Sequence, residues 1–124
     1  MKLRIVGSMT FFEEFVNAKK ELEKKGYQVF LPEKDPMPEP IPIEQKLDAM
    51  RKFNDDLDWA DALLVMNFSK GEKVNHIGAN TLMEIGMAFN RKKKVYLLHP
   101  APDYCKHELD VIGCIILKGD INRV

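Results

Sequence analysis

The feature that most constrains this chain is the segment 62–66, ALLVM, which is apolar at every position. A strand with one solvated face alternates polar and apolar residues, so an unbroken run predicts a strand that is covered on both faces. Such strands are typical of parallel sheets with helices on each side. Four further runs, at residues 3–8, 27–32, 93–99 and 113–120, predict the other strands.

Segments with helical signals separate these runs, at residues 10–26, 43–60, 80–89 and 104–111. Alternating strands and helices with short connections predict an α/β fold with a parallel sheet. Because crossovers between parallel strands are right-handed, we expect a doubly wound five-stranded sheet in the order 2-1-3-4-5. The length of 124 residues fits a single domain spanning residues 1–124.

Composition excludes several classes of partner. Nineteen Lys and Arg residues balance 19 Asp and Glu residues, so no basic surface for nucleic-acid polymers or anionic membranes is expected. No segment approaches the ~18 apolar residues of a membrane span, and the N-terminal residues do not resemble a signal peptide. Cys105 and Cys114 are expected to be reduced thiols, and a cytoplasmic location follows by default. His76, His99 and His107 lack metal-ligand spacing, so neither a metal nor another cofactor is expected.

The topology predicts where a ligand would bind. In an open parallel sheet, ligands lie beyond the carboxyl ends of the strands at the point where the strand order reverses, here between the first and third strands. Gly7 and Ser8 follow the first strand, and Asn67 follows the third. Gly7 permits close backbone approach, and Ser8 offers a hydroxyl near a helix N-terminus, which favours phosphate but is also common turn chemistry. The sequence has no GxGxxG or Walker pattern, so dinucleotide or triphosphate binding is not indicated.

A proline-rich segment, residues 32–42, interrupts the alternation. It holds five prolines in eleven residues, and proline is excluded from helix interiors and central strands. The segment is either a linker or a semi-rigid wall beside the site. We favour the wall because it lies inside one small domain.

The predicted helix around residues 82–89, LMEIGMAF, has a single charged residue, Glu84. Helical geometry predicts that the face on the sheet is formed by Leu82, Ile85, Gly86 and Phe89. The opposite face is also apolar, with Met83, Met87 and Ala88. A helix that is apolar all round is buried all round, so we expect a second subunit to cover it in a homo-oligomer.

Glu84 itself has two interpretations. The sequence TLME fits a capping box, in which Thr81 is the N-cap and Glu84 reaches back to its backbone N–H. Alternatively, a desolvated carboxylate near the ligand crevice has an altered pKa and makes a good nucleophile or base. The two interpretations are compatible, because a capping contact can also orient a nucleophile.

Residues 78–98, GANTLMEIGMAFNRKKKVYLL, closely resemble the core of the nucleoside 2-deoxyribosyltransferase family, which includes related deoxynucleoside 5′-monophosphate N-glycosidases. The matching motif is Glu84-Ile85-Gly86-Met87-Ala88, on a helix that follows a strand like DALLVMN. IVGSMT also resembles the first strand and substrate-binding turn of the family. The element order matches over nearly the whole chain.

The resemblance implies a flavodoxin-like fold, an oligomer with sites near subunit contacts, and Glu84 as the catalytic nucleophile. A carboxylate beneath C1′ can trap an oxocarbenium-like state as a glycosyl-enzyme ester, which a second base or water then resolves with net retention. No cofactor is implied. The residues expected to position the substrate are Gly7, Ser8, Asn67, Gly78 and Asn80, and those expected to form an apolar wall are Met9, Phe12 and Met83.

The chain also departs from the family pattern. Family members carry a second carboxylate before the third strand that helps to protonate the leaving base. Asp55, Asp56 and Asp58 lie in this region, and Asp56 is the nearest candidate. The alternative function is therefore a catalytically silent module that binds or senses a nucleotide. A third is an oligomerising structural domain.

Overall fold

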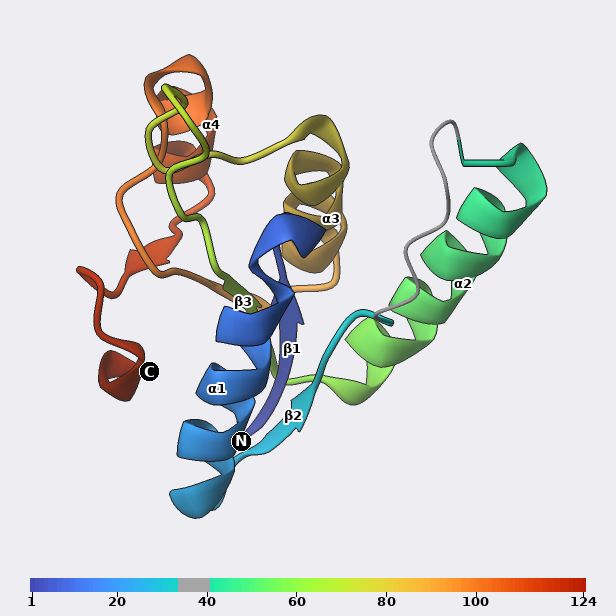
Figure 1. Ribbon diagram of the computed structural model, residues 1–124, viewed down its shortest axis with the longest axis horizontal. Coiled ribbons are helices and arrows are strands. Elements are labelled where there is room, and N and C mark those ends of the chain that lie inside the picture. Colours follow the sequence, from blue (N-terminus) through green and yellow to red (C-terminus); the bar gives the residue numbers. More distant parts are fainter. Residues whose placement is uncertain (34–40) are drawn as a thin grey trace.

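The computed structural model describes residues 1–33 and 41–124. Five parallel strands form one sheet in the order β2-β1-β3-β4-β5 (Figure 1). Their bounds are β1 Lys2–Val6, β2 Gln28–Phe30, β3 Ala62–Val65, β4 Lys94–Leu97 and β5 Ile115–Ile116. The predicted α/β class, strand order and flavodoxin-like doubly wound topology are confirmed. Most of the proline-rich wall predicted at residues 32–42 lies outside the described residues.

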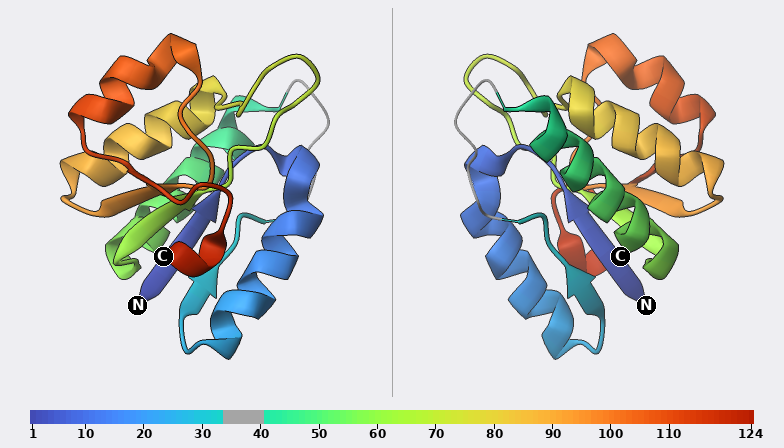
Figure 2. Two further views of the ribbon diagram at one scale, coloured as in Figure 1. Left: turned by 90° about the vertical axis from the view of Figure 1, so that its left-hand side faces the viewer. Right: turned by 90° about the vertical axis from the view of Figure 1, so that its right-hand side faces the viewer.

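Helices cover both faces of this sheet (Figure 2). The main helices are α1 Phe12–Lys24, α2 Ile43–Trp59, α3 Ala79–Asn90 and α4 Lys106–Val111. Short 3-10 turns lie at η1 Met9–Phe11, η2 Asp103–Cys105 and η3 Ile121–Arg123. Helix α1 and the turn η3 pack on one face, whereas α2, α3 and α4 pack on the other.

The central strands β1, β3 and β4 are buried on both faces, as the sequence predicts, whereas the edge strands β2 and β5 are partly exposed. All four residues of β3 are fully buried, and alternate side chains serve the two cores. In β1, Leu3 and Ile5 join the core beneath α1, whereas Val6 joins the core beneath α2 and α3. Arg4 points to this second side and is also buried, with 5% of its surface exposed. A cation therefore lies in the middle of a strand whose other buried residues are apolar.

Helix α3 differs from prediction in its start and in its faces. The N-cap is Gly78, so the predicted capping box of Thr81 and Glu84 is wrong. The face toward the sheet is formed by Thr81, Ile85 and Ala88, whereas Gly86 and Phe89 are exposed. Periodicity could not select the face, because apolar residues continue all round this helix. Met83 is exposed, as expected for the outer face.

Among the described residues, helix α2 packs on the sheet through its C-terminal half. Phe53 and Leu57 are buried against the sheet, but Ile43 and Leu47, which lie nearer the start of the helix, are 85% and 43% exposed. Figure 1 shows the N-terminal half of α2 extending away from the sheet. The apolar residues of this helix are therefore buried only in its second half.

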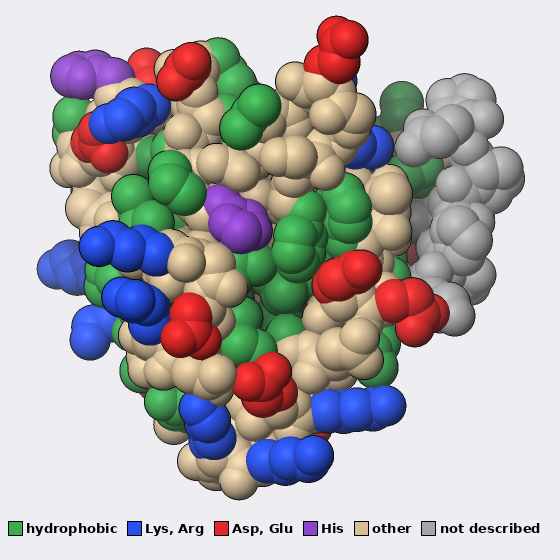
Figure 3. Space-filling view, turned by 60° about the vertical axis from the view of Figure 1, so that its left-hand side comes forward, with side chains coloured by type: hydrophobic (Ala, Val, Ile, Leu, Met, Phe, Trp, Pro, Cys, Tyr) green, Lys and Arg blue, Asp and Glu red, His purple; other side chains and the backbone are tan. Residues whose placement is uncertain are grey.

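The face of the molecule shown in Figure 3 has no large patch of side chains with a single sign of charge. Acidic and basic side chains are interspersed around a patch of hydrophobic ones. Cys105 and Cys114 form no disulfide. Among the described residues, no helix is both long and apolar enough to cross a bilayer.

Candidate active site

The turn after β1 requires glycine at its first position. Gly7 has φ +152°, and a Cβ there would lie 2.9 Å from the carbonyl oxygen of Met66. The exits of β1 and β3 therefore approach closely at the predicted switch point, where only a residue without a side chain fits. Ser8 follows and caps η1, accepting a hydrogen bond from the backbone N–H of Thr10.

Lys70 reaches the same turn from the loop after β3. Its Nζ donates to Ser8 Oγ at 3.3 Å, and both side chains are accessible to solvent. An ammonium group beside a hydroxyl at the carboxyl edge of a sheet suits an anionic group such as a phosphate. Sequence analysis missed Lys70, because the polar loop at residues 68–78 gives no indication of which side chain turns back.

Asn67 lies at the end of β3 but is 1% exposed. Its side-chain amide donates to the carbonyl of His99 at 2.9 Å and accepts the backbone N–H of His99 at 2.9 Å. A second carbonyl, that of Pro100, lies 3.3 Å from the same amide nitrogen. The side chain therefore ties the exits of β3 and β4 together, and any effect on a substrate would pass through that backbone.

Glu84 lies in the second turn of α3 and is half-buried. It is the only charged side chain of this helix, and it makes no hydrogen bond or ion pair within residues 1–33 and 41–124. Burial raises the pKa of Glu84 to about 7, and the nearby charge of Arg4 opposes this rise. A carboxylate near its midpoint at neutral pH, unused by any structural contact, is suited to act as a nucleophile or a base.

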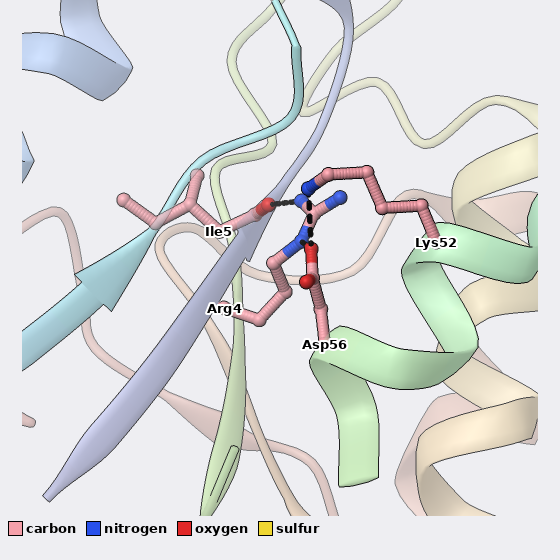
Figure 4. Close-up of polar contacts among 4 residues, drawn as sticks. All are labelled: Arg4, Ile5, Lys52 and Asp56. Carbon is pink, nitrogen blue, oxygen red and sulfur yellow. Dashed lines mark hydrogen bonds and ion pairs between the residues drawn. The ribbon is translucent and has the colours of Figure 1, made fainter. Parts of the chain in front are cut away.

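Asp56, the predicted second carboxylate, lies on α2 and is 6% exposed. Its Oδ2 accepts from Arg4 Nε at 2.7 Å and lies 3.5 Å from Lys52 Nζ (Figure 4). Arg4 also donates to the carbonyl of Ile5, and its guanidinium lies 5.2 Å from the centre of the Phe53 ring. The carboxylate of Asp56 therefore forms an ion pair with Arg4 and is not directed toward the ligand crevice.

Arg4 is the residue near Glu84 that sequence analysis missed. The signal was available in the strand KLRIV: a charged residue at an interior position of a strand that is expected to be buried on both faces. Such a residue is buried with a partner or serves a site.

The predicted substrate contacts are distributed along the carboxyl edge. Met9 is 42% exposed and Met83 is 43% exposed, whereas Phe12 is half-buried beside the ring of Phe15. Asn80 is exposed in the first turn of α3, and Gly78 is half-buried next to His76.

Two cavities lie near α3. One, of about 690 Å³, is lined by Gly78 and Leu82 together with His76 and Tyr104. The other, of about 540 Å³, lies at the opposite end of the helix and includes Phe89. Glu84 lines neither. No cluster of three His, Cys, Asp or Glu side chains suited to a metal ion occurs in the described segments.

Together, the fold and site define a flavodoxin-like α/β protein with a desolvated carboxylate on the helix after the third strand. Comparison of the sequence with protein families and with curated proteins gives no match. The structure is similar to that of a 2-deoxyribosyltransferase from the psychrotolerant bacterium Bacillus psychrosaccharolyticus, described as a biocatalyst for the synthesis of nucleosides. The TM-score is 0.61 at 19% identity, and the match covers 78% of this chain and 71% of that one. The two proteins share a fold.

Proposed function

We propose that this protein cleaves or transfers the N-glycosidic bond of 2′-deoxynucleosides or their 5′-monophosphates, with Glu84 as the nucleophile. The observation that carries the proposal is the state of Glu84: half-buried, free of hydrogen bonds within the described residues, and with a pKa of about 7. The shared fold with a 2-deoxyribosyltransferase supports the same reaction class.

The chemistry has two steps. First, an oxygen of Glu84 forms a bond to C1′ while the bond from C1′ to the base breaks, and the base leaves with the electron pair and takes up a proton. Then a nitrogen of a second base, or water, bonds to C1′ and loses a proton, and the ester bond breaks to return the carboxylate. Two displacements at one carbon give net retention.

Chromatography tests this function directly. The protein is incubated with the 2′-deoxynucleosides and their 5′-monophosphates, with and without a second base, and free or exchanged base is measured. Glu84→Gln should lose turnover by ~10³-fold or more, because the amide cannot form the ester. The matched control is Glu23→Gln, which changes an exposed glutamate on α1 and should leave turnover intact. Absence of turnover by the wild-type protein across the panel would contradict the proposal.

The 5′-monophosphate is the better substrate on this proposal, because Lys70 lies beside Ser8. Lys70→Met should raise KM for a deoxynucleoside 5′-monophosphate by ~10-fold, the loss of one charge-assisted contact, and leave KM for the nucleoside within about two-fold. An equal change in the KM values of the 5′-monophosphate and the nucleoside would show that Lys70 does not bind the phosphate. Lys73→Met, three residues away on the same loop, serves as the control.

The same site is proposed to be completed by a second copy of the chain. Met83 and Phe89 expose 43% and 52% of their surface on the outer side of α3, the helix that carries Glu84. Covering this side would bury apolar surface and exclude water from Glu84.

One observation favours a second function. Asp56, the candidate acid for protonating the leaving base, is already in an ion pair with Arg4. A module that binds a nucleotide without turnover would then show ligand-dependent thermal stabilisation and no product. The same chromatographic panel, run beside a thermal-shift assay, separates the two functions.

A further inference from the structure

The cavity of about 540 Å³ lies at the amino edge of the sheet, away from the turn of Gly7 and Ser8. The end of α3, the start of β4 and the turn between α4 and β5 border it. Its volume is within the range of small-molecule sites, roughly 300–1,000 Å³. No residue that is proposed to bind or attack the substrate lines it.

The lining of this cavity carries positive charge that no acidic side chain offsets. Lys92, Lys93 and Lys94 all line it, and among the described residues no Asp or Glu does. None of the three ammonium groups makes a hydrogen bond or ion pair within residues 1–33 and 41–124. Arg91, the preceding residue, is by contrast paired with Asp58. Three neighbouring cations therefore line one cavity without a counter-charge from the described part of the chain.

Two helices end at this cavity, and each is followed by a residue with positive φ. This residue is Gly113 after α4, with φ +78°, and Lys92 after α3, with φ +59°. In both turns the backbone N–H of the next residue donates to the carbonyl five positions earlier, at 3.2 Å after α4 and 3.0 Å after α3. Such a turn favours glycine, which α4 has. Helix α3 therefore keeps a lysine side chain beside the cavity at a conformational cost.

The three lysines supply more charge than the helix ends need. A helix C-terminus carries about half an elementary negative charge, so two of them offset roughly one of the three ammonium groups. The remaining walls are apolar and include Phe89, Val95 and Ile112. The cavity therefore combines surplus positive charge with apolar surface.

We propose that this cavity is a second binding site, for a small organic anion. A phosphate or carboxylate group of the ligand would be held by Lys92, Lys93 and Lys94, and its apolar part would pack on Phe89, Val95 and Ile112. The inference does not depend on the reaction proposed for Glu84. Because Phe89 also lies on the side of α3 that a second copy is proposed to cover, lysine variants test the cavity.

Hexyl phosphate is a suitable probe, because it joins one phosphate group to an apolar chain. Titration of isotope-labelled protein, followed by amide NMR, should show saturable shifts at residues 89–95 and 112–115. Inorganic phosphate and hexanol each carry one part of the probe and should bind ~10-fold more weakly or less. The inference is overturned if these residues show no saturable shift up to about 10 mM hexyl phosphate, or if inorganic phosphate binds equally well.

Lys92→Gly separates a binding role from a role at the helix end. Glycine suits the positive φ, so the midpoint of urea unfolding should stay the same or rise, while the Kd for hexyl phosphate should increase about five-fold. Lys93→Gln/Lys94→Gln should increase this Kd by ~10-fold or more. The matched control is Lys20→Gln/Lys24→Gln, which changes two exposed lysines of α1 and should leave the Kd within about two-fold. An unchanged Kd in both cavity variants would overturn the inference.

A lipid headgroup offers the same chemistry as a free organic anion. Co-sedimentation with vesicles of phosphatidylglycerol and phosphatidylcholine distinguishes the two sources. Binding to these vesicles without NMR shifts from hexyl phosphate would overturn the cavity site in favour of a membrane contact. Glu84→Gln should bind hexyl phosphate as the wild type does, because Glu84 does not line this cavity. Loss of the NMR shifts in that variant would place the probe in the proposed active site and overturn the inference.

Discussion

Glu84 is half-buried and has no hydrogen-bonded partner among the described residues. This lowers the stability of the folded protein at neutral pH. Burial raises its pKa to about 7, so the folded protein holds a proton on this carboxyl at pH values where the unfolded chain has lost it. The unfolded state ionises near pH 4.3. Stability contributed by this residue is therefore greatest at low pH, falls as pH rises from about 4 to about 7, and is constant above that range.

Glu84→Gln should consequently stabilise the protein at pH 8 by about 1–3 kcal/mol, a range reduced to allow for the partial exposure of the carboxyl. At pH 4 the variant and the wild type should differ by less than about 0.5 kcal/mol, because the carboxyl is then protonated in both states. Urea denaturation at the two pH values measures the difference. A gain of equal size at both pH values would show that packing, not ionisation, is responsible.

Gly7 and Gly26 both adopt positive φ values, but only Gly7 is crowded. Gly26→Ala should cost about 1 kcal/mol for the unfavourable backbone conformation alone, since nothing lies within 4 Å of its Cβ position. Gly7→Ala should cost a further 1–3 kcal/mol or so, because the new methyl group meets the carbonyl of Met66. Thermal or urea unfolding of the two variants compares them. Equal losses would mean that the β1 turn can widen freely.

At the scale of elements, α2 is held to the rest of the molecule by two kinds of ion pair. Asp56 meets Arg4 in the core, whereas Asp58, two residues later, meets Arg91 at the surface at 3.1 Å, with 69% of the Asp58 side chain exposed. The first pair is shielded from water and the second is screened by it.

The two aspartates allow one substitution to be compared in two environments. Asp58→Ala should cost at most about 1 kcal/mol, as is usual for exposed pairs. Asp56→Ala should cost about 3–5 kcal/mol, because it leaves a buried guanidinium without its partner. Urea denaturation at pH 7 measures both. Similar losses at the two positions would indicate that Arg4 finds water or another acceptor when Asp56 is removed.

Helices and strands could be predicted from the sequence where the hydrophobic pattern fitted a single kind of structure. The buried face of a helix and its N-cap could not. ALLVM identified β3 because a run this short and fully apolar has few other structures open to it. The face of α3 was assigned wrongly for Gly86, Ala88 and Phe89, since an all-apolar helix contains several acceptable stripes. Its N-cap was also wrong, because Gly78 can start a helix as well as Thr81 when no side-chain contact is needed.

For the whole molecule, the strand order followed from rules of handedness that need no individual residue. The site depends on contacts between residues far apart in the chain. Arg4 and Asp56 are separated by 52 positions, and Lys70 reaches Ser8 across 62. Nothing in a local pattern specifies such pairs. Glu84 was proposed from the sequence because its apolar neighbours along the helix already indicate burial, and its role as nucleophile stays a prediction.

Assembly is the prediction that belongs to this scale. We expect light scattering to find a dimer or larger oligomer at micromolar concentration, and Met83→Glu/Phe89→Glu to produce a monomer by placing charge on the apolar outer side of α3. Val111→Glu changes a side chain on α4 that is 71% exposed, and it should leave the oligomer intact. A monomeric wild-type protein would remove the argument for a shared site.

The loop after β3 closes on itself, with the backbone N–H of His76 donating to the carbonyl of Phe68 at 3.0 Å. Lys70 and Lys73 bridge within it, and Asn67 anchors its first end to the exit of β4. We therefore expect mutations inside residues 69–75 to leave the sheet and the helix of Glu84 undisturbed. On the proposed function, this is the segment in which a laboratory library is expected to change substrate range while the chemistry is retained.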